Sequence, residues 1–242
     1  MLRLRQIAFV ARKLAPIERT IREVLGLEVA FRDPMVATWG LENAVFPLGH
    51  QFLEVVAPTT DGTAGGRQLD RRGGDGGYMV ILQCDDQSGY RDRAAGLSVR
   101  TAFEFADHGY RCWQLHPRDT GGAFLEIDVQ GGGEDMKGPW HPAGGHWQNA
   151  IRTSVVKGIA VAEIQAADPA RLAARWSTIL GRPTESGADG ATRIRLDNAD
   201  LRFVADRDGR GDGLGGIDLV LADPDRALPA EVGGVRVRGV AE

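Results

Sequence analysis

Two stretches of the sequence share one residue pattern. Residues 6–25 read QIAFVARKLAPIERTIREVL, and residues 161–180 read VAEIQAADPARLAARWSTIL. Each begins with a short apolar run typical of a strand and continues with apolar residues at helical spacing. Gly26 and Gly181 follow the two helical stretches, in the position that favours a left-handed cap. Because the copies align without a gap, the sequence predicts an internally repeated strand–helix unit.

Short strand-like runs follow both copies, and stretches beginning at Tyr78 and Gly216 have the same outline. The sequence therefore predicts four βαβββ modules, at residues 3–58, 76–130, 157–206 and, truncated, 214–240. One module cannot cover both faces of its sheet, so the modules must pair. We predict an α+β fold in which tandem modules form cupped, mostly antiparallel sheets. Residues 1–150 would be one half and residues 151–242 the other.

Composition limits the function classes. The 242 residues are 43% hydrophobic, which is enough to bury a substantial core, and the net charge is −4. This charge argues against a protein that coats nucleic acid or an anionic membrane. No apolar run approaches the roughly 20 residues of a spanning helix. Cys84 and Cys112 lie in strand-like apolar runs and are interpreted as buried thiols, which favours a cytoplasmic location.

Two glutamates interrupt apolar strands at matching places. Glu54 lies in the run FLEVV and Glu126 in the run FLEID, each at the end of a module. A glutamate between apolar neighbours is costly if it is buried alone, so it should face water, a cation or a ligand. A solvated outer face would explain one such glutamate. Its repetition at the same module position favours a function.

The modules and the glutamates resemble the vicinal oxygen chelate superfamily, which includes glyoxalase I, methylmalonyl-CoA epimerases and extradiol dioxygenases. The resemblance covers most of the chain. It is strongest in QIAFVARKL, in FLEVVAP and in HPRDTGGAFLEID, which is similar to a hairpin of the epimerases. It implies a cup formed by two modules around a divalent metal, with ligands on the first and last strand of each module.

Carried over position by position, the resemblance implies Gln6, Glu54 and Glu126 as metal ligands, with Zn, Ni, Mn, Mg or Fe as the ion. The fourth ligand position falls on Met79, which such a cation would not choose. Glu54 and Glu126 would also be the catalytic residues, as proton acceptors. Met79 and His116, which opens the HPRDTGG turn, would line the substrate pocket.

The second half lacks these ligands. Val161 stands where Gln6 stands, and Arg202 stands where Glu54 stands. We therefore expect residues 151–242 to be structural or to cover a ligand. Between the halves, Trp140 and Trp147 lie in a glycine-rich segment that could be a lid over the cup or a clip that packs the halves together.

Two functions follow as hypotheses. The first is a metal-dependent lyase or isomerase of the glyoxalase or epimerase type, acting on a small oxygen-rich substrate through an enediolate. The alternative is a non-catalytic small-molecule binder with a degenerate metal site, which Met79 favours. Either protein would bind a small molecule, not nucleic acid or a membrane, as a monomer or homodimer.

Overall fold

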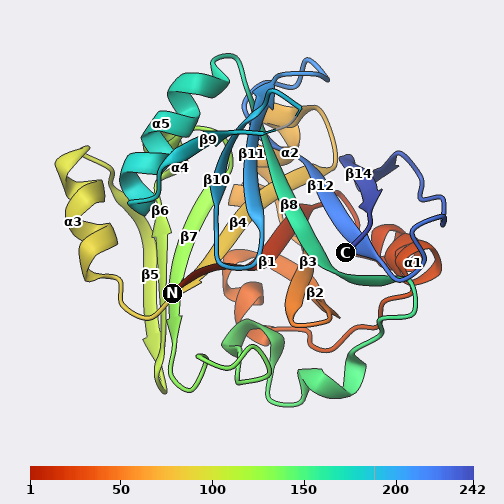
Figure 1. The fold of residues 1–242 in the computed structure, drawn as a ribbon. Helices are drawn as coiled ribbons and strands as arrows, with labels where there is room; N and C mark the ends of the chain where they lie inside the picture. Colours follow the sequence, from red (N-terminus) through yellow and green to blue (C-terminus); the bar gives the residue numbers. More distant parts are fainter. Residues whose placement is uncertain (188) are drawn as a thin grey trace.

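The computed structural model describes residues 1–187 and 189–242, which form two seven-stranded sheets (Figure 1). The elements of the first sheet and its helices lie in residues 2–130. They are β1 (Leu2–Val10), α1 (Leu14–Leu25), the 3₁₀ helix η1 (Pro34–Trp39), β2 (Leu41–Leu48), β3 (Gln51–Pro58), α2 (Ala64–Arg72), β4 (Gly76–Cys84), α3 (Ser88–Gly96), β5 (Thr101–Asp107), β6 (Tyr110–Leu115), α4 (Pro117–Thr120) and β7 (Phe124–Gln130).

Two short 3₁₀ helices, η2 (His141–Ala143) and η3 (Trp147–Ala150), lie in the segment between the sheets. The second sheet and its helix follow. They are β8 (Val156–Ala166), α5 (Pro169–Leu180), β9 (Thr184–Ser186), β10 (Thr192–Arg195), β11 (Asp200–Ala205), β12 (Gly213–Leu221), β13 (Glu231–Val232) and β14 (Val235–Val240). No helix of the described residues has the length and apolar character needed to cross a membrane.

The two sheets have corresponding strand orders. The first runs β2-β3-β1-β4-β7-β6-β5, and the second, taken in the same direction, runs β9-β10-β11-β8-β12-β14-β13. The central strands β3-β1-β4-β7 of the first sheet correspond to β11-β8-β12-β14 of the second. In each sheet the first strand of one module pairs antiparallel with the first strand of the next, as β1 with β4 and β8 with β12. The same first strand pairs in parallel with the last strand of its own module, as β1 with β3 and β8 with β11.

The repeated strand–helix unit forms as the sequence predicts. Helix α1 buries Leu14, Ile21 and Leu25, and Gly26 ends it at φ 66°. Asp168 caps the N-terminus of helix α5, where its carboxylate accepts the backbone N–H of Arg171, and Gly181 ends the helix at φ 62°. Since a left-handed backbone conformation strains any residue with a Cβ, glycine is favoured at the C-terminal end of both α1 and α5.

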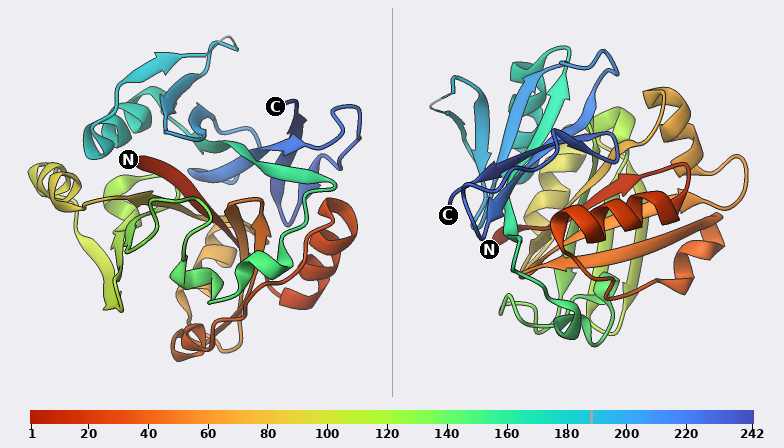
Figure 2. Two further views of the ribbon diagram at one scale, coloured as in Figure 1. Left: turned by 60° about the horizontal axis from the view of Figure 1, so that its bottom comes forward. Right: turned by 90° about the vertical axis from the view of Figure 1, so that its right-hand side faces the viewer.

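The sheets lie against each other as two layers (Figure 2). One continuous cluster of buried apolar residues contains side chains of both sheets, for example Leu82 of β4 and Ile217 of β12. The layers lie close together at Gly77, where an added Cβ would stand 2.3 Å from the Leu214 carbonyl oxygen. A second, smaller cluster lies on the other face of the first sheet and includes Phe52, Tyr110, Trp140 and Trp147.

A bulge in β1 sets which side chains reach this second face. The pairing of β1 with β4 shifts between Leu4 and Gln6, so that Arg5 is the extra residue. Leu4 therefore packs in the inter-sheet core, whereas Arg5 lies over the Phe52 ring and Gln6 lines a cavity on the outer face. Simple strand alternation would have placed Arg5 and Gln6 on opposite faces.

Candidate active site

A cavity of about 490 Å³ opens on the outer face of the first sheet. Its floor contains the four positions that the sequence analysis assigned to ligands, Gln6, Glu54, Met79 and Glu126. Its walls are largely aromatic and aliphatic, and they come from both modules. They include Met35, Val36, Trp39, Leu41, Tyr78, Phe103, Phe105 and Tyr110.

His116 lies elsewhere. It precedes α4 as the N-cap residue, and its ring nitrogen accepts the backbone N–H of Arg118 at 3.3 Å. The His116 side chain caps this turn, and His116 is not among the cavity-lining residues. The polar turn that suggested a substrate contact is thus explained locally by helix capping.

Glu54 is buried and receives two amide donors. Gln6 Nε2 donates to Glu54 Oε2 at 2.8 Å, and Asn43 Nδ2 donates to Glu54 Oε1 at 2.7 Å. Strand register produces this arrangement, because Gln6 on β1 and Asn43 on β2 are the diagonal neighbours of Glu54 on either side of β3. Asn43 is not among the residues predicted from the sequence. Its only signal was a polar residue inside the apolar run of β2.

Other donors fix the orientation of both amides. Trp140 Nε1 donates to Gln6 Oε1 at 2.8 Å, and the backbone N–H of Asp33 donates to Asn43 Oδ1 at 2.8 Å. An indole N–H and a peptide N–H can only donate, so each amide must turn its oxygen toward them. Both NH₂ groups consequently face Glu54, which is the arrangement that holds a carboxylate rather than a carboxylic acid.

Burial disfavours the ionised form of Glu54, which these donors stabilise. It raises the pKa of Glu54 from 4.5 to about 7, the nearby charge of Glu126 adds to the rise, and the Asn43 and Gln6 hydrogen bonds oppose it. The result is a buried carboxyl group whose pKa lies near neutral pH. Such a group can take up and release a proton during a reaction.

The second glutamate has different partners. Glu126 Oε2 accepts Gln114 Nε2 at 3.1 Å, and the same amide nitrogen lies 3.9 Å from Met79 Sδ. Burial raises the pKa of Glu126. Asp128 lies two residues further along β7, and its pKa is also raised, by burial and by the Glu126 charge. Two buried carboxyl groups at this spacing favour sharing a proton.

The predicted ligand set fits a divalent ion poorly. An amide binds a metal through its oxygen, and the Gln6 oxygen accepts the Trp140 N–H. Met79 offers only a thioether. A different group has ligand spacing, since one ligand atom from each of Cys112, Glu126 and Asp128 lies within 4.8 Å of the others. A thiol and two carboxyl groups are ligands that Zn²⁺ accepts.

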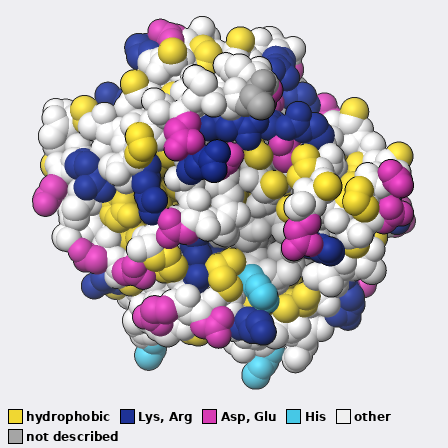
Figure 3. Space-filling model, viewed as in Figure 1, with side chains coloured by type: hydrophobic (Ala, Val, Ile, Leu, Met, Phe, Trp, Pro, Cys, Tyr) yellow, Lys and Arg dark blue, Asp and Glu magenta, His cyan; other side chains and the backbone are white. Residues whose placement is uncertain are grey.

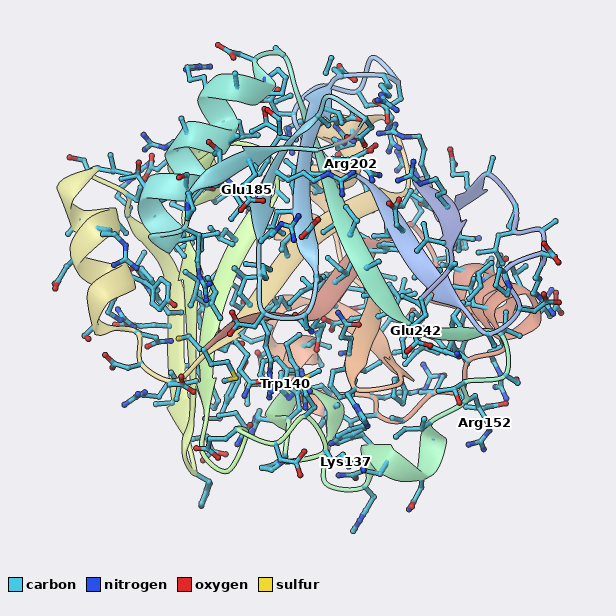
Figure 4. All side chains as sticks on the ribbon, in the orientation of Figure 1. Lys137, Trp140, Arg152, Glu185, Arg202 and Glu242 are labelled. Atoms are coloured by element: carbon cyan, nitrogen blue, oxygen red, sulfur yellow. The ribbon has the colours of Figure 1, made fainter. Side chains whose placement is uncertain are left out.

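The matching positions of the second sheet carry opposite charge. Register places Arg202 where Glu54 stands, and Arg238, paired with Asp218, where Glu126 stands, paired with Ile81. Arg202 donates to both oxygens of Asp218, at 2.6 and 2.9 Å, and to Glu163 at 2.8 Å. The cup of the second half is thus filled by ion pairs. Lys and Arg side chains gather over this face (Figure 3), and Arg202 is labelled on it in Figure 4.

The segment between the sheets covers the first sheet. Trp140 stacks on Phe52 with ring centroids 6.4 Å apart, and Trp147 meets the same ring edge-on at 5.0 Å. Both indoles are buried in the cluster on the outer face. In Figure 4 Trp140 lies in the lower part of the view, apart from Arg202 of the second sheet. This segment therefore forms part of the support for the cavity floor.

Comparison with solved structures shows the fold. Over the full length of both chains, the structure is similar to a hypothetical protein from Staphylococcus aureus, with a TM-score of 0.69 and 12% identity. The predicted α+β architecture of paired βαβββ modules is confirmed by the strand order of both sheets.

Shorter matches cover about half of the chain. A Streptomyces coelicolor methylmalonyl-CoA epimerase variant, in complex with 2-nitronate-propionyl-CoA, matches 53% of this chain and 96% of its own, with a TM-score of 0.47 and 21% identity. The Mycobacterium tuberculosis methylmalonyl-CoA epimerase matches 52% of this chain and 87% of its own, with a TM-score of 0.46 and 19% identity. No protein-family model matches the sequence, and no curated protein does.

Proposed function

We propose that the protein is an epimerase- or isomerase-type enzyme that moves a proton on a carbon next to a carbonyl group of a small substrate. One observation carries this proposal. Glu54 is a buried carboxylate at the floor of a cavity, held by two amides of fixed orientation, and its pKa is raised to about 7. A base with this pKa is ionised in a useful fraction at neutral pH and is strong enough to accept a proton.

Glu126 would be the second proton-transfer group. It lines the same cavity, and burial favours its protonated form. In this scheme Glu54 takes the proton from the carbon and Glu126 supplies one from its own side. Two carboxyl groups in different environments can divide the roles of base and acid in this way. The intermediate is an enediolate, whose charge the Gln114 amide would stabilise by donating to the substrate oxygen.

A divalent cation would be held by Cys112, Glu126 and Asp128 better than by the predicted set that contains Gln6, and Glu126 would then be an ionised ligand in place of the proton donor. A cation bound there would supply charge stabilisation to an oxygen of the substrate. The tyrosine hydroxyl of Tyr110 already donates to Asp128 at 2.7 Å and holds that carboxyl in place. Metal content, measured after purification without a chelator or a nickel column, tests this part of the proposal.

The lining also suggests the substrate class. The floor is acidic and the walls are apolar, and Arg67 supplies the one Lys or Arg side chain among the described residues of the lining. An anionic group of the substrate would be repelled by the ionised form of Glu54 and attracted toward Arg67. We therefore propose a small acid or thioester whose apolar part fills the cavity and whose anionic group lies at Arg67.

The second half would be structural in this proposal. Its ion pairs occupy the positions where the first half has its cavity floor, and the charges of Arg202, Glu163 and Asp218 satisfy one another. We propose that residues 151–242 stabilise the back of the first sheet through the shared core.

Proton exchange with solvent tests the function. The first probe is methylmalonyl-CoA, the ligand class named for the Streptomyces protein, incubated in D₂O with the full chain. The second is the hemithioacetal of methylglyoxal and glutathione. We expect ¹H NMR to show loss of the C–H signal beside the carbonyl of a true substrate, at a rate that Glu54→Gln abolishes.

The binder hypothesis has its own support in Met79, which puts a thioether where a ligand would complete a metal site. For a binder, calorimetry would detect a bound probe that exchanges no proton with the solvent. That result would favour sequestration over catalysis.

A further inference from the structure

Trp140 donates a hydrogen bond to the side chain of Gln6. It comes from the segment between the two sheets and is buried against Phe52, Tyr110 and the guanidinium of Arg5. This packing leaves the ring little freedom, and the rigid indole directs its N–H at Gln6 Oε1 at 2.8 Å. A side chain far from Gln6 in sequence thus controls one end of the Gln6 amide.

We propose that Trp140 is a positioning residue that locks the Gln6 amide with its NH₂ group on Glu54 and its oxygen turned away. The first-strand position of the site then donates a hydrogen bond to Glu54 and is withheld from metal coordination. An amide NH₂ group has no lone pair to offer a cation, so its orientation alone decides between these two roles.

The arrangement on the other side of Glu54 supports this interpretation. Asn43 is locked in the same sense by the backbone N–H of Asp33 and also presents its NH₂ group to Glu54. Two amides on different strands are therefore oriented by two independent donors toward the same carboxylate. A site organised around a metal would need at least the Gln6 oxygen to point inward.

Trp147 provides a matched control. It lies in the same segment, contacts the same Phe52 ring at 5.0 Å, and has Arg5 5.7 Å from its own ring. Its indole nitrogen is buried and has no hydrogen-bond partner among the described residues. Replacing either tryptophan with Phe removes similar packing, but only Trp140→Phe removes a donor from Gln6.

The first measurement is NMR of the indole and side-chain amide N–H groups in the full chain. We expect Gln6→Leu to shift the Trp140 indole signal upfield and to speed its exchange with solvent, while the Trp147 signal stays in place. Trp140→Phe should shift the Gln6 NH₂ signals, and Trp147→Phe should leave them unchanged. This readout needs no substrate, so it can fail or succeed independently of the proposed function on which the role of Glu54 rests.

The second measurement is Mn²⁺ binding by calorimetry. Trp140→Phe leaves the buried Gln6 oxygen without its donor and free to turn toward a cation beside Glu54. One hydrogen bond of ordinary strength corresponds to a change in affinity of roughly three- to tenfold, so we expect Mn²⁺ to bind tighter by that factor. Trp147→Phe should bind Mn²⁺ like the wild type, and adding Gln6→Ala to Trp140→Phe should remove the gain.

Two results would overturn the proposal. One is equal Mn²⁺ affinity in Trp140→Phe and Trp147→Phe. The other is a wild-type Mn²⁺ site that Gln6→Ala destroys, because Gln6 would then be a ligand in the native protein. If Trp140→Phe does not fold, the Gln6→Leu spectrum decides: an unmoved Trp140 indole signal refutes the lock.

Discussion

Arg202 occupies in the second sheet the position that Glu54 occupies in the first. Glu54 is paired across the strands with Ala8, and Arg202 is paired with Glu163. The repeat thus keeps a buried charge at the same place while reversing its sign. In the first sheet the charge faces a cavity, and in the second it is neutralised by neighbours. One backbone plan therefore supports a candidate active site in one half and an ion-pair network in the other.

Replacing the two glutamates by Gln should have opposite effects on stability. In Glu54→Gln the new NH₂ group must face an NH₂ group of Gln6 or Asn43, because both amides are locked. The buried clash of donors should cost about 1–3 kcal/mol of unfolding free energy.

Glu126→Gln is the matched case. Its new amide can accept from Gln114 and donate to Asp128, and it removes one of two crowded carboxyl groups. We expect its melting temperature at pH 8 to equal or exceed that of the wild type, and calorimetric scans of both variants check this. Equal destabilisation of the two would contradict the amide orientation.

The activity should depend on pH through Glu54. A base must be ionised, so kcat/KM for proton exchange should rise with pH and level off above about pH 7, where the raised pKa of Glu54 lies. Asn43→Leu removes a hydrogen bond that lowers this pKa, so the rise should move to higher pH. A profile that is the same in wild type and variant would exclude Glu54 as the titrating base.

Stability should follow the same group in the opposite direction. The folded pKa of Glu54, about 7, lies above the ordinary value of 4.5, so the folded state binds more protons over this range. By linkage, the contribution of Glu54 to the unfolding free energy is highest below about pH 4.5 and falls as pH rises to about 7, by at most about 3 kcal/mol. Denaturant titrations at several pH values measure this slope. It should be reduced in Glu54→Leu, which cannot ionise.

Removing one partner from the buried ion pairs of the second sheet should strongly destabilise the fold. Arg202→Met leaves Glu163 and Asp218 buried without their shared cation, which should cost about 3–5 kcal/mol. Arg195→Met breaks only the exposed pair with Glu185 and should cost at most about 1 kcal/mol. Chemical denaturation of the two variants compares these values. A small loss in Arg202→Met would show that water reaches the network.

Met79 offers a gain-of-function test. It lines the cavity and its sulfur lies 3.9 Å from the Gln114 amide nitrogen, beside Glu126. Met79→His adds an imidazole to the carboxyl groups there and should tighten Zn²⁺ binding in calorimetry. Met79→Leu keeps the size and adds no ligand, so it should bind Zn²⁺ as the wild type does. Equal affinities in all three proteins would contradict the placement of this side chain.

The sequence by itself determined the fold class and the position of the interesting carboxylates. The repeated apolar spacing and the glycines after each helix are local properties, and backbone geometry translates them directly into strand, helix and cap. The FLE pattern marked Glu54 and Glu126 because alternation in a strand makes a charged residue among apolar ones conspicuous.

Only the tertiary structure decided how these carboxylates are held. Strand register brings Asn43 beside Glu54, and a bulge at Arg5 turns Gln6 to the cavity face. Trp140, more than a hundred residues away, then fixes which end of the Gln6 amide the site sees. Hydrogen bonds between residues distant in sequence have no periodicity that a sequence pattern could reveal, because the packing of whole strands and of the connecting segment creates them.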